Sequence, residues 1–310
     1  MEYSSYVMAR TRTAKIALCC LLAAWTGGCG AEFDPQSLVN KFRILAVKSD
    51  PAEGAPGQQI VFTPLLSDSV YNRQPIHIWM TCLPHPGQSG RQCLEDGGGT
   101  QVGTEETLTI TLPELADDED EKEISVTLLV CAGIPRMPDF EKEDYDFCES
   151  PENDVAIKTV TIIRENQNNN PRLETLTISV PGSEDIVPQE GDRPDLACTG
   201  DCEEITLTLV LSPDSIETYE AIRFEEIVTL EENPFISWFA TAGEFSDSRT
   251  YESDYEDREE PREELAHEVN WIPPDEGIDE EVTFYFVAYD GRGGVDYRTQ
   301  VTHIIADAKD

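Results

Sequence analysis

Apolar and polar residues alternate along much of the chain, and this period of two is typical of a β-strand with one buried face. The segments with this alternation, or with a short β-branched run, are Phe42–Val47, Ile60–Leu66, Ile76–Cys82, Thr107–Leu112, Ile124–Val130, Val155–Ile163, Leu176–Val180, Ile205–Leu211, Phe235–Ala240, Val282–Tyr289 and Val295–Ile305. Long helical periodicity is absent. The one ambiguous stretch, Glu217–Leu230, contains Ile227-Val228-Thr229 and therefore favours strand.

Several short strands per unit, joined by glycine and proline turns, predict an all-β protein built of β-sandwiches. The polar run Asn166-Gln-Asn-Asn-Asn-Pro171 interrupts the pattern, and the strands restart after it. We therefore expect one sandwich at residues 41–165, a linker at 166–172 and a second sandwich at 173–310. Long loops must take up the excess length of each unit. The expected loops are the acidic stretches Ala116–Glu123, Glu141–Asp154 and Glu252–Glu264.

Segments near the C-terminal end carry a resemblance to a known fold. Asn270-Trp-Ile-Pro-Pro-Asp-Glu-Gly277, followed by Val282-Thr-Phe-Tyr-Phe-Val-Ala-Tyr-Asp290-Gly-Arg-Gly-Gly294, resembles the last hairpin of immunoglobulin-like and polycystic-kidney-disease-type domains. Ile236-Ser-Trp-Phe-Ala-Thr-Ala-Gly-Glu-Phe245 resembles their central tryptophan strand. The resemblance implies two tandem immunoglobulin-like β-sandwich domains, as in predicted bacterial lipoproteins of this type, and it specifies a fold better than a function.

Residues 1–28 have the order of a secretory signal peptide. A positive segment with Arg10, Arg12 and Lys15 precedes the apolar run Ile16–Trp25, and small residues follow that run. The apolar run is too short to cross a hydrocarbon core of about 30 Å. We therefore expect residues 1–28 to be removed on export.

The residues Thr26-Gly27-Gly28-Cys29 resemble the lipobox of bacterial lipoproteins, in which the cysteine becomes the lipidated first residue. The match departs from the family pattern at Thr26, where leucine is usual. The resemblance implies palmitate-type acyl chains on Cys29 and a lipid-anchored tether at residues 29–40. Because Gly30 is not aspartate, it also implies the outer membrane, facing the periplasm or the surface. An ordinary cleaved signal with an incidental cysteine is the alternative.

The chain carries 22 Lys and Arg against 62 Asp and Glu, for a net charge of −40. The charge becomes −42 when three basic residues and one acid leave with the signal. Such a protein has no positive field to neutralise phosphates, which excludes a general nucleic-acid binder. It also argues against electrostatic docking on anionic lipid, so we expect the N-terminal lipid to make the contact with the membrane.

Six cysteines remain when Cys19, Cys20 and Cys29 are set aside, and an even number in an exported chain predicts disulfides. Spacing favours the local pairs Cys82 with Cys93, Cys131 with Cys148, and Cys198 with Cys202. The main rival pairs Cys82 with Cys131, because both end strong strands. A zinc site at Cys198 and Cys202 is disfavoured, because no second pair or nearby histidine accompanies them.

No catalytic motif emerges from the sequence. The histidines His77, His85, His267 and His303 lie outside any nucleophile elbow or zinc-protease helix motif. Carboxylates are so numerous that pairs of them carry no information about glycoside hydrolysis. We therefore expect no catalytic residues, with an envelope hydrolase whose site lies in the acidic loops as the alternative.

Calcium is the one cofactor that the acidic residues suggest, because it binds six to eight oxygen ligands. Asp290, Asp296 and the run Asp117–Glu121 are the possible ligands, but none fits a D-x-D-x-D-G loop, and a solvated surface is favoured. A calcium-dependent adhesion module is therefore an alternative only. The favoured function is a lipid-anchored envelope protein with a binding or structural role, its partner another envelope protein or a polysaccharide. A subunit of an envelope complex, in which one sandwich edge pairs with a partner strand, is a further alternative.

Overall fold

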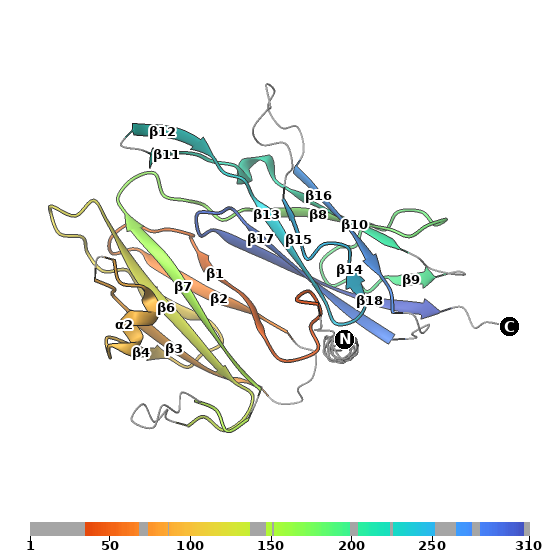
Figure 1. Ribbon diagram of the computed structural model, residues 1–310, viewed down its shortest axis with the longest axis horizontal. Coiled ribbons are helices and arrows are strands. Elements are labelled where there is room, and N and C mark those ends of the chain that lie inside the picture. Colours follow the sequence, from red (N-terminus) through yellow and green to blue (C-terminus); the bar gives the residue numbers. More distant parts are fainter. Residues whose placement is uncertain are drawn as a thin grey trace, which may run out of the picture. The chain divides into compact units, whose positions relative to one another are not determined.

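The computed structural model describes residues 35–67, 74–85, 87–136, 147–150, 152–198, 204–223, 226–251, 265–274 and 280–306. Residues 35–310 belong to one compact unit. The predicted all-β fold is confirmed, with strands grouped into two tandem immunoglobulin-like sandwiches (Figure 1). Among the described residues, no helix is long and apolar enough to cross a membrane. Cys29 and the expected signal peptide lie outside the described residues.

The first sandwich has two antiparallel sheets. One sheet has the order β1–β2–β5, formed by Ile44–Asp50, Gln59–Leu66 and Leu108–Thr111. The other has the order β4–β3–β6–β7, formed by Thr100–Gly103, Ile76–Cys82, Glu121–Cys131 and Asn153–Ile163. Trp79 of β3 and Leu128 of β6 are opposite each other in register and lie on the core face, where both are fully buried.

The second sandwich is larger. One sheet has the order β14–β16–β10–β8, formed by Glu244–Phe245, Leu265–Ile272, Ile205–Leu211 and Leu173–Ser179. The other has the order β15–β13–β17–β18–β9, formed by Arg249–Tyr251, Phe235–Ala240, Glu280–Tyr289, Val295–Ala306 and Asp195–Cys198. Trp238 lies at the centre of the core, and its indole Nε1 donates to Thr250 Oγ1 at 2.9 Å.

The ambiguous stretch at 217–230 forms a separate two-stranded ribbon, preceded by the short 3₁₀ turn η2 (Pro213–Ser215). Its strands are β11 (Thr218–Arg223) and β12 (Glu226–Glu231), so the strand prediction is confirmed. One α-helix that the sequence did not predict, α2 (Gly90–Glu95), follows β3 (Figure 1). The loop expected at Ala116–Glu123 ends earlier than predicted, because β6 begins at Glu121.

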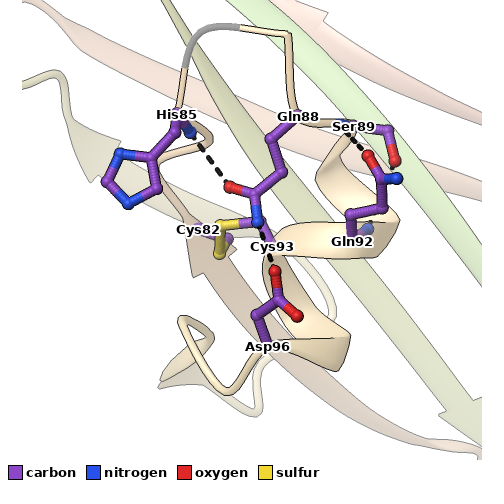
Figure 2. Close-up of a disulfide and its surroundings, with 7 residues drawn as sticks. All are labelled: Cys82, His85, Gln88, Ser89, Gln92, Cys93 and Asp96. Carbon is purple, nitrogen blue, oxygen red and sulfur yellow. Dashed lines mark hydrogen bonds between the residues drawn. A yellow bond between two sulfur atoms is a disulfide. The ribbon is translucent and has the colours of Figure 1, made fainter.

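Two of the predicted disulfides are confirmed, Cys82–Cys93 and Cys131–Cys148, and the rival pairing of Cys82 with Cys131 does not form. The first bond ties α2 to the outer face of β3, and a capping box at Ser89 and Gln92 begins the helix (Figure 2). The Gln88 side chain stabilises the preceding turn: its Oε1 accepts from the His85 amide at 3.0 Å, and its Nε2 donates to Asp96 Oδ2 at 2.7 Å. Cys202 and the side chain of Cys198 lie outside the described residues.

Removing the first disulfide with the double substitution Cys82→Ala/Cys93→Ala is expected to lower the free energy of unfolding by about 3 kcal/mol, because the bond closes a short loop in the unfolded chain. Urea unfolding followed by tryptophan fluorescence measures the change. The oxidised wild-type chain is the reference, and the pair Cys131→Ala/Cys148→Ala provides a matched control with a similar loop. A loss below about 1 kcal/mol would show that α2 is held by its packing instead.

Candidate functional site

The two sandwiches are joined by an apolar cluster that lies outside both of their own cores. Its buried members come from β1, β2, β17, β18 and the segment before β1, and they are Val39, Leu45, Ala46, Leu65, Tyr285, Val287 and Val295. In β17, Phe284 and Phe286 face the core of the second sandwich, so Tyr285 and Val287 face the first. A register shift between Ile44 and Ala46 of β1 turns two successive residues toward the cluster.

Polar contacts surround the apolar cluster. Lys48 Nζ of β1 lies 2.8 Å from Asp296 Oδ1 of β18. The hydroxyls of Tyr289 and Tyr297 donate to the carbonyls of Leu45 and Pro64, each at 3.5 Å. These contacts give the junction a buried apolar centre and a satisfied polar rim, the arrangement of a stable protein interface.

The segment at 166–172, where the sequence predicts a linker, is hydrogen-bonded to both sandwiches through its asparagines. The Asn168 amide donates to Glu53 Oε2 at 2.8 Å, and its Nδ2 donates to Asp290 Oδ2 at 2.7 Å. Asn170 donates from Nδ2 to the carbonyl of Ser49 and accepts from the amide of Val295. An asparagine side chain carries both donors and an acceptor, so Asn170 can join backbone groups from the two sandwiches.

Arg292 lies at the centre of the junction, in the turn between β17 and β18. Its guanidinium is 3.1 Å from Glu232, 3.6 Å from Glu217 and 3.8 Å from Glu53, and it stacks 4.6 Å from the ring centre of Tyr219. One side chain therefore contacts the first sandwich and the end of the β11–β12 ribbon where β11 begins and β12 ends. The planar guanidinium, with five donors, suits such a set of carboxylates and an aromatic face.

The turn that presents Arg292 is shaped by Asp290. Its carboxylate Oδ1 accepts from the amides of Arg292 at 2.7 Å and Gly294 at 2.9 Å. Gly291 and Gly293 have φ of +88° and +110°, which glycine adopts without a steric penalty. A β-carbon on Gly294 would lie 1.9 Å from the Asp290 carboxylate, so a side chain there would displace it.

Burial shifts the pKa values of several charged groups at the junction. It raises the pKa of Glu232 to about 7, and the charge of Asp290 adds to the rise. Burial also raises the pKa of Glu53 above its ordinary value, against the opposing effects of the Asn168 amide and Arg292. Lys158 of β7 donates to the carbonyl of Gly293, and burial lowers its pKa to about 8. Structural ion pairs perturb pKa values as catalytic sites do, so these shifts alone indicate no catalysis.

The raised pKa of Glu232 gives stability a defined pH dependence. Between pH 4.5 and 7 the folded chain keeps a proton that the unfolded chain releases, so this group makes stability fall as pH rises across that window. The expected loss is roughly 2–3 kcal/mol, complete above pH 7. Glu232→Gln should remove this part of the pH dependence of stability.

The measurement for Glu232 is the difference between wild-type and variant unfolding free energies at pH 5 and pH 8. Taking the difference cancels other titrating groups, including His77, whose pKa burial lowers. Glu231→Gln, at the neighbouring exposed position, is the matched control. Parallel pH profiles for wild type and Glu232→Gln would contradict the expected titration.

The residues singled out for calcium have other partners or lie apart. Asp290 holds its own turn, and Asp296 accepts from Lys48 and from the amide of Leu173 at 3.0 Å. In the part of the chain that is described, no group of three or more His, Cys, Asp or Glu side chains is arranged to hold a metal ion. The expected acidic loop at 252–264 lies outside the described residues.

The described histidines are not brought together. His77 and His267 are buried in different sandwiches, and His267 Nδ1 contacts Thr250 Oγ1 at 3.3 Å. His85 belongs to the turn before α2, and His303 lies 3.3 Å from Asp195 in β9. The junction residues Glu53, Asn168 and Arg292 were missed by sequence reasoning. Two features of the sequence could have indicated Asn168 and Arg292: the asparagine run and an arginine within a glycine-rich turn.

No family model and no curated protein sequence matches the chain. Solved structures that match the chain include the Yersinia pseudotuberculosis adhesin InvE, at 12% identity and a TM-score of 0.21, covering 83% of this chain and 58% of that one. The N-terminal Ig1-2 module of the Drosophila receptor protein tyrosine phosphatase DLAR matches at 11% identity and a TM-score of 0.23, covering 86% and 100%. A putative membrane anchored protein from Corynebacterium diphtheriae matches at 10% identity and a TM-score of 0.21, covering 87% and 60%.

Proposed function

We propose that this protein is a lipid-anchored component of the cell envelope with a non-catalytic binding or structural role, in which both sandwiches act as one rigid unit. The junction carries the proposal. Its buried charges, which in an enzyme would be candidates for chemistry, are engaged in joining the sandwiches: Arg292 and Asn168 each bond groups from two elements. A rigid two-domain unit is suited to holding a binding surface at a fixed distance and orientation from a membrane anchor.

The envelope location is supported by the N-terminal sequence and by the cysteines. Disulfides persist in oxidising compartments, and the described chain has two. By resemblance to the lipobox, Cys29 carries the lipid. The partner, in this proposal, is another envelope protein or a polysaccharide.

Replacing the proposed lipid site, as in Cys29→Ser, is expected to move the protein from the membrane fraction to the soluble fraction of the envelope. A single acyl chain binds membranes only marginally, and several chains anchor stably, so loss of all of them should release most of the protein. Detergent phase partitioning and metabolic labelling with a palmitate analogue measure the change. Cys20→Ser is the matched control, and unchanged partitioning of Cys29→Ser would refute lipidation.

The binding role is tested by affinity capture from the native envelope with the anchor intact, followed by mass spectrometry. A reproducible envelope partner that is lost on competition with untagged protein supports the proposal. Recovery of no partner, together with turnover of substrates in a hydrolase panel, would overturn it in favour of an enzyme.

A further inference from the structure

The second sandwich has a cleft beside its first and last strands, at a place where its chain is longer than in the first sandwich. In each sandwich the first strand begins with an amide that donates to an aspartate at the second position of the last strand. These bonds are Ile44 to Asp154 Oδ2 at 2.8 Å and Leu173 to Asp296 Oδ2 at 3.0 Å. Eight residues after each aspartate, the last strand makes a parallel contact, Ile162 with Gly54 and Ile304 with Leu196.

The chain between these two equivalent points differs in length between the sandwiches. In the first it runs from Ile44 to Gly54, and in the second from Leu173 to Leu196, which adds thirteen residues. The added segment contacts both strands: Ile186 pairs with Ile178 of β8, and the carbonyls of Pro188 and Asp192 accept from Arg298 and Gln300 of β18. A cleft of about 520 Å³ lies there, walled by residues 173–176 of β8, 296–299 of β18 and 187–190 of the added segment.

Both long walls of the cleft are strand edges. Strand β8 ends its sheet, and β9 pairs with β18 only over His303–Ala306, so among the described residues no strand pairs with the edge of β18 at 295–302. The amides of Val295 and His303 point to this edge, because they donate to Asn170 and to the carbonyl of Pro194. Since alternate amides of a strand point the same way, those of Tyr297 and Thr299 also point to the edge.

We propose that this cleft binds an extended polypeptide segment of a partner protein, which adds as a strand along β18 at Asp296–Thr299. Four residues on each wall match an extended segment of about 13 Å. Main-chain hydrogen bonds supply affinity in such strand addition, and side-chain pockets supply specificity. The inference rests on the proposed binding function and identifies the chemistry of the partner.

The charge of the protein favours a segment with basic residues. Of the three carboxylates that line the cleft, Glu174 pairs with Arg172 and Asp296 pairs with Lys48, which leaves Glu190 for a basic residue of the segment. Arg298 Nη2 donates to the carbonyl of Pro188 at 2.6 Å, and its Nε is buried without a hydrogen-bond partner. A carbonyl from an incoming backbone would satisfy that donor if the side chain turned toward it. The net charge of −40 on the whole protein disfavours an acidic segment.

A polysaccharide fits this cleft less well. Tyr297 is the one aromatic side chain among the described lining residues, and it packs into the apolar cluster at the junction, with its hydroxyl donating to Pro64. The ring is therefore engaged on the opposite face of β18 and offers no platform for a sugar ring.

The test uses the full chain in detergent and an acetylated, amidated octapeptide of alternating Lys and Thr. Its controls are a version N-methylated at alternate amides, a Glu-for-Lys version, and chitohexaose as the sugar probe. Amide hydrogen exchange and ¹⁵N–¹H spectra report on Tyr297 and Thr299. Binding of the Lys peptide with about tenfold or greater protection of these amides, lost on N-methylation, supports the proposal.

Thr299→Pro removes one edge amide and should weaken peptide binding about tenfold, whereas Thr100→Pro, at the start of exposed edge strand β4, should leave it unchanged. If Thr299→Pro does not fold, Glu190→Lys should reduce the preference for the Lys peptide over the Glu peptide about fivefold. Binding that survives N-methylation, chitohexaose protecting the same amides, or no peptide binding up to about 5 mM each overturns the strand site. A partner captured from the envelope that still binds Thr299→Pro would leave the broader binding function standing while refuting this cleft.

Discussion

Replacing Arg292 with methionine is expected to lower the free energy of unfolding at pH 7 by about 3–5 kcal/mol, the cost of removing one partner from a buried charge network. The Arg292 side chain is 18% exposed, and that of its partner Glu232 is 1% exposed. Without the guanidinium, the carboxylates of Glu53, Glu217 and Glu232 face each other with no cation among them. The loss should be smaller at pH 5 than at pH 8, because protonation of Glu232 relieves the repulsion.

Urea unfolding at both pH values measures the effect. Arg193→Met is the matched control, because its ion pair with Glu281 is 2.5 Å long but mostly exposed, and such pairs contribute about 0–1 kcal/mol. The double variant Arg292→Met/Glu232→Gln should recover part of the loss, since it removes the most deeply buried uncompensated carboxylate. An Arg292→Met variant as stable as Arg193→Met would show that the junction does not depend on its charges.

The strands could be predicted because each has a face that must be buried against its own sandwich. Leu207 and Leu209 of β10 alternate with polar residues, and the same period locates the strand and its core face. Strand β3 was harder to orient, because both faces carry large side chains. His77 and Trp79 face the core, whereas Ile76, on the opposite face, is 40% exposed. The apolar outer face of β3 is instead partly covered by α2, which the disulfide holds in place.

The junction could not be predicted, because its residues are selected by contacts between distant segments. Asn168 lies in a run whose polarity predicts a linker, yet that polarity supplies the hydrogen bonds that join the sandwiches. One signal was available in β17, where Val282–Tyr289 is apolar at nearly every position. A strand apolar on both faces is typical of one that is covered on both faces. Tyr285 and Val287 could therefore have indicated a second packing surface.

Val287→Asp tests whether that second surface couples the two sandwiches. Val287 is fully buried in the apolar cluster, away from the core of its own sandwich. A carboxylate there can avoid the cost of burial only if the sandwiches separate and let water reach it. The free energy of unfolding is expected to fall by about 3–5 kcal/mol. Its size is set by whichever change has the smaller free-energy cost, burial of the charge or opening of the junction.

The two changes are distinguished by the form of the unfolding curve. The wild-type chain should unfold in a single transition, with tryptophan fluorescence and far-ultraviolet circular dichroism coinciding. If the junction opens in Val287→Asp, the sandwiches lose their coupling and the curve divides into two transitions. Ile227→Asp, at a position 71% exposed on β12, is the control and should change stability by less than about 0.5 kcal/mol. A single transition with an unchanged midpoint in Val287→Asp would mean that the apolar contact does not couple the sandwiches. The rigid unit would then depend on Arg292 and the asparagines alone.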